Sequence, residues 1–133
     1  MNLFELTAQQ ILEHIKTGKA SCEDIAAAVR QRASSVNPRT NALIRLSSGT
    51  APEGGACPVP IALKDNICVQ GQLTTCASKI LDGFKPPYDA CVVEKVKASG
   101  GVILGSANMD EFAFGSSCET SAYGPARNPW DLD

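Results

Sequence analysis

The stretch CPVPIALKDNIC, residues 57–68, places two charged residues at the end of an apolar run. Val59, Ile61 and Leu63 alternate with small or polar residues, which predicts a half-buried strand. The alternation puts Lys64 on the opposite face of that strand. Lysine side chains are rarely buried, so this stretch alone predicts a solvated lysine. The blocks of sequence that follow this stretch suggest a second interpretation of Lys64, in which the lysine has a functional role.

Two helix-start signals precede the strand. Thr7 and Ser21 are predicted N-caps, each with a polar side chain three residues further on that completes a capping box. Gly18 ends the first apolar helical pattern, and Asn37-Pro38 is predicted to end the second. The two patterns together predict a helical hairpin over residues 1–38.

A mixed strand and helix pattern occupies residues 39–133. Because strands alternate with helices, the order predicts an α/β fold in which helices cover a sheet. Aliphatic runs at 42–46 and 102–104 predict two further strands, and residues 47–58 are rich in Ser, Gly, Ala and Pro, which predicts a loop. The remaining predicted features are a helical turn within 74–81, a helix capped by Asp89 and closed at Gly100-Gly101, and a short helix at 108–114 ended by Gly115.

Composition limits the classes of function. The 133 residues correspond to about one domain, with 44% apolar residues, a net charge of −2 and no long Lys/Arg run. These features give no support for a nucleic-acid groove or a membrane partner. The N-terminus shows no signal-peptide pattern, and no apolar run is long enough to span a membrane. The six cysteines lack metal-ligand spacing, so we expect reduced, structural thiols in a cytoplasmic protein with no metal site.

Five blocks of the sequence resemble the amidase signature family in order and spacing, and the resemblance covers essentially the whole chain. It implies that residues 1–133 form the N-terminal portion of the amidase signature fold, a helical hairpin followed by part of a mixed sheet covered by helices. The blocks are PIALKDNI (60–67), TTCASKIL (74–81), PPYDACVVEKVKASGGVILG (86–105), NMDEFAFGSS (108–117) and NPWDL (128–132).

The resemblance assigns Lys64 as the catalytic base of a Ser-cis-Ser-Lys hydrolase. In this family both serines lie in a Gly/Ser-rich segment that we expect beyond residue 133. A lysine base must lose its proton, and an amine does so near neutral pH only when it is well buried. We therefore expect Lys64 to be partly solvated in this chain alone, and the chain alone to be inactive. Two local serine pairs are weaker candidates for the nucleophile. Ser116-Ser117 lacks the glycine-flanked context, and Ser47-Ser48 lies in the predicted loop with no base nearby in the sequence.

Five other residues are secondary candidates. The resemblance implies that Phe114, Gly115 and Ser116 line the acyl site, although a turn after a short helix explains them equally well. Asp65 and Asn66 either hold the lysine in place by hydrogen bonds or only end the strand.

Within the family, TTCASKIL and NMDEFAFGSS most resemble the glutamine-hydrolysing A subunits of aspartyl/glutamyl-tRNA amidotransferases. The resemblance implies glutamine as the ammonia donor and subunits B and C as partners. It also implies that the partner subunit binds aminoacyl-tRNA and uses ATP and Mg²⁺, with no cofactor bound by this chain. Two alternatives remain open: another amidase-signature hydrolase, and a non-catalytic truncated protein that binds a partner.

Overall fold

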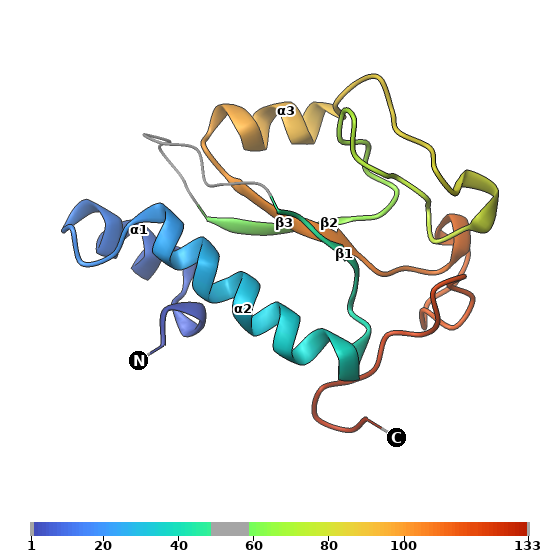
Figure 1. Ribbon diagram of the computed structural model, residues 1–133, viewed down its shortest axis with the longest axis horizontal. Coiled ribbons are helices and arrows are strands. Elements are labelled where there is room, and N and C mark those ends of the chain that lie inside the picture. The colour runs from blue at the N-terminus through green and yellow to red at the C-terminus, as the bar shows by residue number, and fades with distance from the viewer. Residues whose placement is uncertain (1, 49–58, 133) are drawn as a thin grey trace.

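The computed structural model describes residues 2–48 and 59–132, in which a three-stranded sheet lies between helices (Figure 1). Helix α2 lies against one face of the sheet and α3 against the other, as the family resemblance implies for this α/β fold. The predicted loop at 47–58 falls mostly outside the described residues. The elements are η1 (Leu3–Glu5), α1 (Ala8–Lys16), α2 (Cys22–Thr40), β1 (Leu43–Leu46), β2 (Pro60–Lys64), η2 (Lys79–Leu81), α3 (Cys91–Ala98), β3 (Val102–Ala107) and η3 (Glu111–Ala113).

The sheet is mixed, with strand order β1-β3-β2. Strand β3 runs parallel to β2 and antiparallel to β1, so the last strand in the sequence is the central one. Helix α3 connects β2 to β3, because parallel neighbours need a crossover connection. The pairing of Lys64 with Ala107 places the end of β2 beside the end of β3.

Both predicted helix starts are confirmed. The Thr7 side chain accepts a hydrogen bond from the backbone N–H of Gln10, and the Ser21 side chain accepts one in the same way at the start of α2. The predicted end of α2 at Asn37-Pro38 is wrong, because the helix continues to Thr40. Pro38 lies in the last turn, where it removes one hydrogen bond without ending the helix.

The predicted cap of α3 is also wrong. Residue 90 is the N-cap and makes no side-chain cap bond, while Asp89 instead accepts hydrogen bonds from the Gln70 backbone N–H at 2.8 Å and from the Lys97 amine at 2.6 Å. Within α3, Val93 is fully buried, whereas its neighbour Val92 is 46% exposed.

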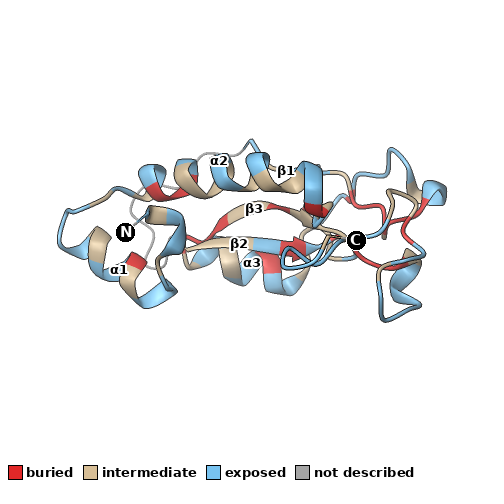
Figure 2. Cartoon of the chain, turned by 90° about the horizontal axis from the view of Figure 1, so that it is seen from below, coloured by how far each residue is buried: buried red, intermediate tan, exposed pale blue. Residues whose placement is uncertain are grey.

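Figure 2 shows that the buried residues are scattered over the helices, the sheet and the connecting segments. Leu63 and Val93 form a core cluster with Val69, so the apolar face of β2 packs against α3 as the alternation predicted. Among the described residues, no helix is both long and apolar enough to cross a membrane.

Candidate active site

Lys64 is the last residue of β2, and its side chain is exposed. The alternation that buries Leu63 against α3 turns Lys64 to the opposite side of the strand. Within residues 2–48 and 59–132, the Lys64 amine makes no hydrogen bond or ion pair. The expected solvation of this lysine is therefore confirmed.

An open cavity of about 360 Å³ lies beside Lys64. Its opposite wall comes from residues 108–118, which follow β3, so the adjacent ends of β2 and β3 bring the lysine and this segment together. Gly115 and Ser116, two of the predicted substrate-lining residues, line the cavity together with Ser117. Phe114 does not line it and is 84% exposed.

Asp110 shapes the wall of this cavity. Its buried carboxylate accepts hydrogen bonds from the backbone N–H of Cys118 at 2.8 Å and from the backbone N–H and hydroxyl of Thr120 at 3.2 and 2.9 Å. The Cys118 bond, followed by those from Thr120, holds the pKa of Asp110 below its ordinary value. The wall is therefore organised around a charged carboxylate.

The short helix predicted at 108–114 is only the single turn η3. Phe112 and Ala113 adopt left-handed backbone conformations, with φ of 52° and 64°, which an α-helix does not contain. The Glu111 carboxylate accepts a hydrogen bond from the Ser78 hydroxyl, so it ties this turn to the segment around η2.

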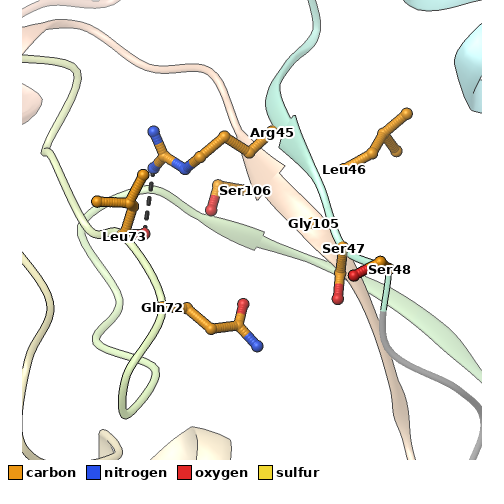
Figure 3. Close-up of a pocket in the computed structure, with 8 residues that line it drawn as sticks. All are labelled: Arg45, Leu46, Ser47, Ser48, Gln72, Leu73, Gly105 and Ser106. Carbon is orange, nitrogen blue, oxygen red and sulfur yellow. Dashed lines mark hydrogen bonds between the residues drawn. The ribbon is translucent and has the colours of Figure 1, made fainter. Parts of the chain in front are cut away.

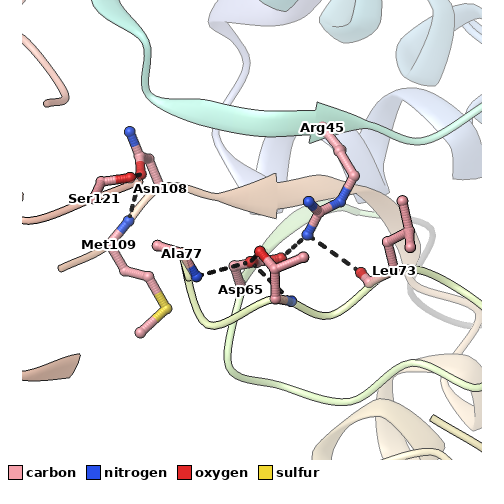
Figure 4. A network of polar contacts seen from close by, with 8 residues as sticks. Arg45, Asp65, Leu73, Ala77, Asn108, Met109 and Ser121 are labelled. Atoms are coloured by element: carbon pink, nitrogen blue, oxygen red, sulfur yellow. Dashed lines mark hydrogen bonds and ion pairs between the residues drawn. The ribbon is translucent and has the colours of Figure 1, made fainter. Parts of the chain in front are cut away.

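Asp65 and Asn66 have different surroundings. Asp65 is 1% exposed, and its carboxylate accepts hydrogen bonds from the Arg45 guanidinium, the Thr75 backbone and hydroxyl, and the Ala77 backbone (Figure 4). Asn66 is exposed, and its side chain makes no hydrogen bond in the described part of the chain. Asp65 therefore stabilises the backbone next to Lys64.

Two partners of Asp65 were not anticipated from the sequence. Arg45 lies on β1, at the other edge of the sheet, and Thr75 lies in a segment whose pattern was ambiguous. A salt bridge between residues 20 positions apart has no local sequence signature. The charged Arg45 within an aliphatic strand was the one available signal.

A second cavity, of about 370 Å³, lies beside Arg45 (Figure 3). The Arg45 guanidinium also donates to the Leu73 carbonyl at 3.3 Å, which fixes the side chain at the cavity's rim. Gln72, Ser48 and Ser106 contribute polar atoms to the lining. The Arg45 charge is already balanced by Asp65, so this cavity presents no free cationic group from that residue.

Metal ligation finds no support in the described residues, which contain no group of three His, Cys, Asp or Glu side chains arranged to hold an ion. The five cysteines in the same part of the chain are free thiols.

Comparison with known proteins gives matches over the whole chain. The sequence profile of the family described as Amidase matches residues 11–133. The A subunit of glutamyl-tRNA(Gln) amidotransferase from Desulfatibacillum aliphaticivorans is 42% identical over 146 residues, which cover 99% of this chain and 30% of the relative. The chain thus spans about 30% of the length of the curated relatives it matches.

Two solved structures have similar folds. The A subunit of glutamyl-tRNA(Gln) amidotransferase from Thermotoga maritima superimposes with a TM-score of 0.89 and 37% identity, over 99% of this chain and 29% of that one. The 6-aminohexanoate cyclic dimer hydrolase superimposes with a TM-score of 0.90 and 30% identity, over the same shares of the two chains.

Proposed function

This chain belongs to the amidase signature family, and we propose that it is the N-terminal part of the glutamine-hydrolysing A subunit of a tRNA-dependent amidotransferase. The identity of 42% to a named A subunit across the whole chain supports this subfamily, whereas the identity to the cyclic dimer hydrolase is 30%. The position of Lys64 is the observation that carries the catalytic part of the proposal. Its amine makes no hydrogen bond or ion pair within the described residues and lies beside a cavity lined by Gly115 and Ser116.

In the proposed reaction, the neutral Lys64 amine accepts a proton from one serine, which in turn accepts the proton of a second serine. The second serine attacks the side-chain amide carbonyl of glutamine, and ammonia leaves after it takes up a proton. Water then hydrolyses the γ-glutamyl ester to glutamate. We propose that both serines come from outside the described residues, since no hydroxyl among those residues bonds to Lys64.

We further propose that the released ammonia passes to a partner subunit of a complex with subunits B and C. That partner would use ATP and Mg²⁺ to activate Glu-tRNA(Gln) or Asp-tRNA(Asn), so this chain itself would hold no cofactor. The net charge of −2 is consistent with tRNA contacts that lie mainly on the partner, since a tRNA-binding surface is usually basic. The cytoplasm is the proposed location, where translation supplies these substrates.

A chimera tests the proposal. Residues 1–133 would replace the matching segment of the Thermotoga maritima protein, and glutamine hydrolysis would be followed by ammonia release. We expect the chimera to hydrolyse glutamine. In the chimera, Lys64→Ala should lower the rate of hydrolysis by about 10²- to 10⁴-fold, which is the usual contribution of a general base. Lys85→Ala is the matched control, because Lys85 is an exposed lysine outside the cavity.

Three outcomes would contradict parts of this proposal. Full activity in Lys64→Ala would remove the lysine from the mechanism. Hydrolysis of simple amides but not of glutamine would favour the alternative function, an amide hydrolase of another kind. The structural similarity to the cyclic dimer hydrolase is the observation that supports this alternative. Glutamine hydrolysis by residues 1–133 alone, lost in Lys64→Ala, would show that the serines lie within this chain.

A further inference from the structure

We propose that Arg45 and Asp65 act together as positioning residues that set the place of the Lys64 amine relative to the cavity wall. The inference rests on the proposed role of Lys64 as a base. It extends that role to Arg45, which lies on the far edge strand of the sheet and does not line the lysine cavity.

The Lys64 side chain makes no polar contact in the described chain, so the neighbouring backbone determines where it starts and which way it points. Asp65 fixes that backbone on both sides. Its backbone N–H donates to the Ala107 carbonyl at 3.2 Å, and its carbonyl accepts from the Cys76 N–H at 3.1 Å. The residue after the lysine is thus bonded to the end of β3 and to the segment around Cys76.

The carboxylate of Asp65 completes this anchor. One oxygen accepts from Arg45, and the other accepts from Thr75 and from the Ala77 N–H at 3.2 Å. The side chain is fully buried, so its charge needs a nearby cation. Arg45 supplies that cation by reaching across the sheet from β1, as Figure 4 shows.

The same segment also holds the opposite wall of the cavity. The Cys76 carbonyl accepts from the Phe112 N–H and the Ala77 carbonyl from the Ala122 N–H, both at 2.9 Å. Cys76 and Ala77 have φ of 50° and 53°, a left-handed conformation that is unfavourable without glycine. Asp65 holds both residues in that conformation, and so connects the lysine strand to the segments on either side of Gly115.

A cross-linking experiment on residues 1–133 tests this role without measuring catalysis. Lys64 and the native thiol of Cys118 line the same cavity, so a short amine-to-thiol reagent should join them. The product would be identified by peptide mass spectrometry. Cys91 and Lys95, four residues apart on α3, provide an internal reference link in every sample.

Each variant is cross-linked at a temperature below its own melting temperature. We expect Asp65→Asn and Arg45→Met to lose most of the yield of the Lys64–Cys118 link, measured relative to the reference link. Arg45→Lys keeps a cation near Asp65 and should recover part of the yield. Val93→Ala is the control for stability. It removes part of a buried side chain from the core cluster between β2 and α3, so it should destabilise the fold but leave the yield of the Lys64–Cys118 link unchanged.

An unchanged Lys64–Cys118 yield in folded Asp65→Asn or Arg45→Met would overturn the proposal. An equal loss in Val93→Ala would also overturn it, because the effect would then follow stability alone. If both pair variants fail to fold, Arg45 and Asp65 are folding determinants and the positioning role is rejected. Since no catalysis is measured, a failure here leaves the chimera test of glutamine hydrolysis unaffected.

Discussion

The carboxylate of Asp110 lies against the backbone of Gly115 and occupies the space where any other residue would place its Cβ. A Cβ at this position would be 2.6 Å from either carboxylate oxygen, which is far closer than such atoms approach in proteins. Gly115 lines the cavity beside Lys64, and its role toward substrate stays a prediction. The structure adds a separate reason for glycine here, because the missing side chain makes room for a buried carboxylate.

Gly115→Ala should therefore destabilise the fold by about 1–3 kcal/mol, the usual cost of forcing extra atoms into a packed site. Urea unfolding followed by circular dichroism would measure the change. The matched control is the same substitution in an Asp110→Ala background, where the added methyl group no longer meets a carboxylate. An equal cost in both backgrounds would show that the Asp110 contact is not the reason for glycine.

Acid should weaken the folded state through Asp110. Because its pKa is lowered in the folded chain, the unfolded state binds the proton more tightly. The stabilisation that the charged carboxylate gives to the folded state is complete at a pH above the pKa of the unfolded chain, about 3.9. It is lost as the pH falls through the lower pKa of the folded chain. Melting temperatures between neutral and acid pH should fall less steeply in Asp110→Asn than in the wild type. Glu13→Gln, at an exposed carboxylate on α1, should retain the wild-type slope.

Lys64→Ala should change the stability of residues 1–133 by no more than about 0.5 kcal/mol, as is usual for exposed positions without special contacts. The side chain is exposed and uncommitted, so its removal breaks no described interaction. Urea midpoints of the two proteins give the comparison. A loss of about 2 kcal/mol or more, on the order of a lost buried contact, would mean that the lysine has a structural role here.

Arg45→Met should have the opposite outcome. Removing one partner of a buried ion pair typically costs about 3–5 kcal/mol, because the other charge is left without compensation. Since the Arg45 side chain is 24% exposed, water can reach it and the lower end of that range is expected. A double-mutant cycle with Asp65→Asn would show a large coupling, whereas independent effects would rule out the pair as a unit.

The sequence predicted local structure best where a nearby side chain determines it. Thr7 and Ser21 cap their helices within three residues, and the alternation of β2 correctly places Leu63 inside and Lys64 outside. The end of α2 was placed too early, because proline in a last turn costs only the bond that its missing N–H would make. Gly115 and Ser116 line the same cavity as Lys64, and their predicted contact with substrate stays a prediction.

The remaining features depend on contacts between distant residues. Asp89 was expected to cap α3, but it bonds to Gln70 and Lys97, and nothing in its own neighbourhood signals that choice. Arg45 lies on β1 and Asp65 directly follows β2, the two strands on either side of β3, so their contact depends on the order of the strands in the sheet. Periodicity describes one element at a time, so it cannot specify such a pair.

The central place of β3 has a consequence during synthesis on the ribosome. Strands β1 and β2 are made first, yet neither pairs with the other, and each must wait for residues 102–107 to emerge before it gains a hydrogen-bonded neighbour in this sheet. Pairing over so long a stretch of chain is slow, and the waiting strands are open to nascent-chain binding factors. Codon changes that delay translation between residues 64 and 102 should therefore lower the yield of folded protein more than equal delays placed after residue 107.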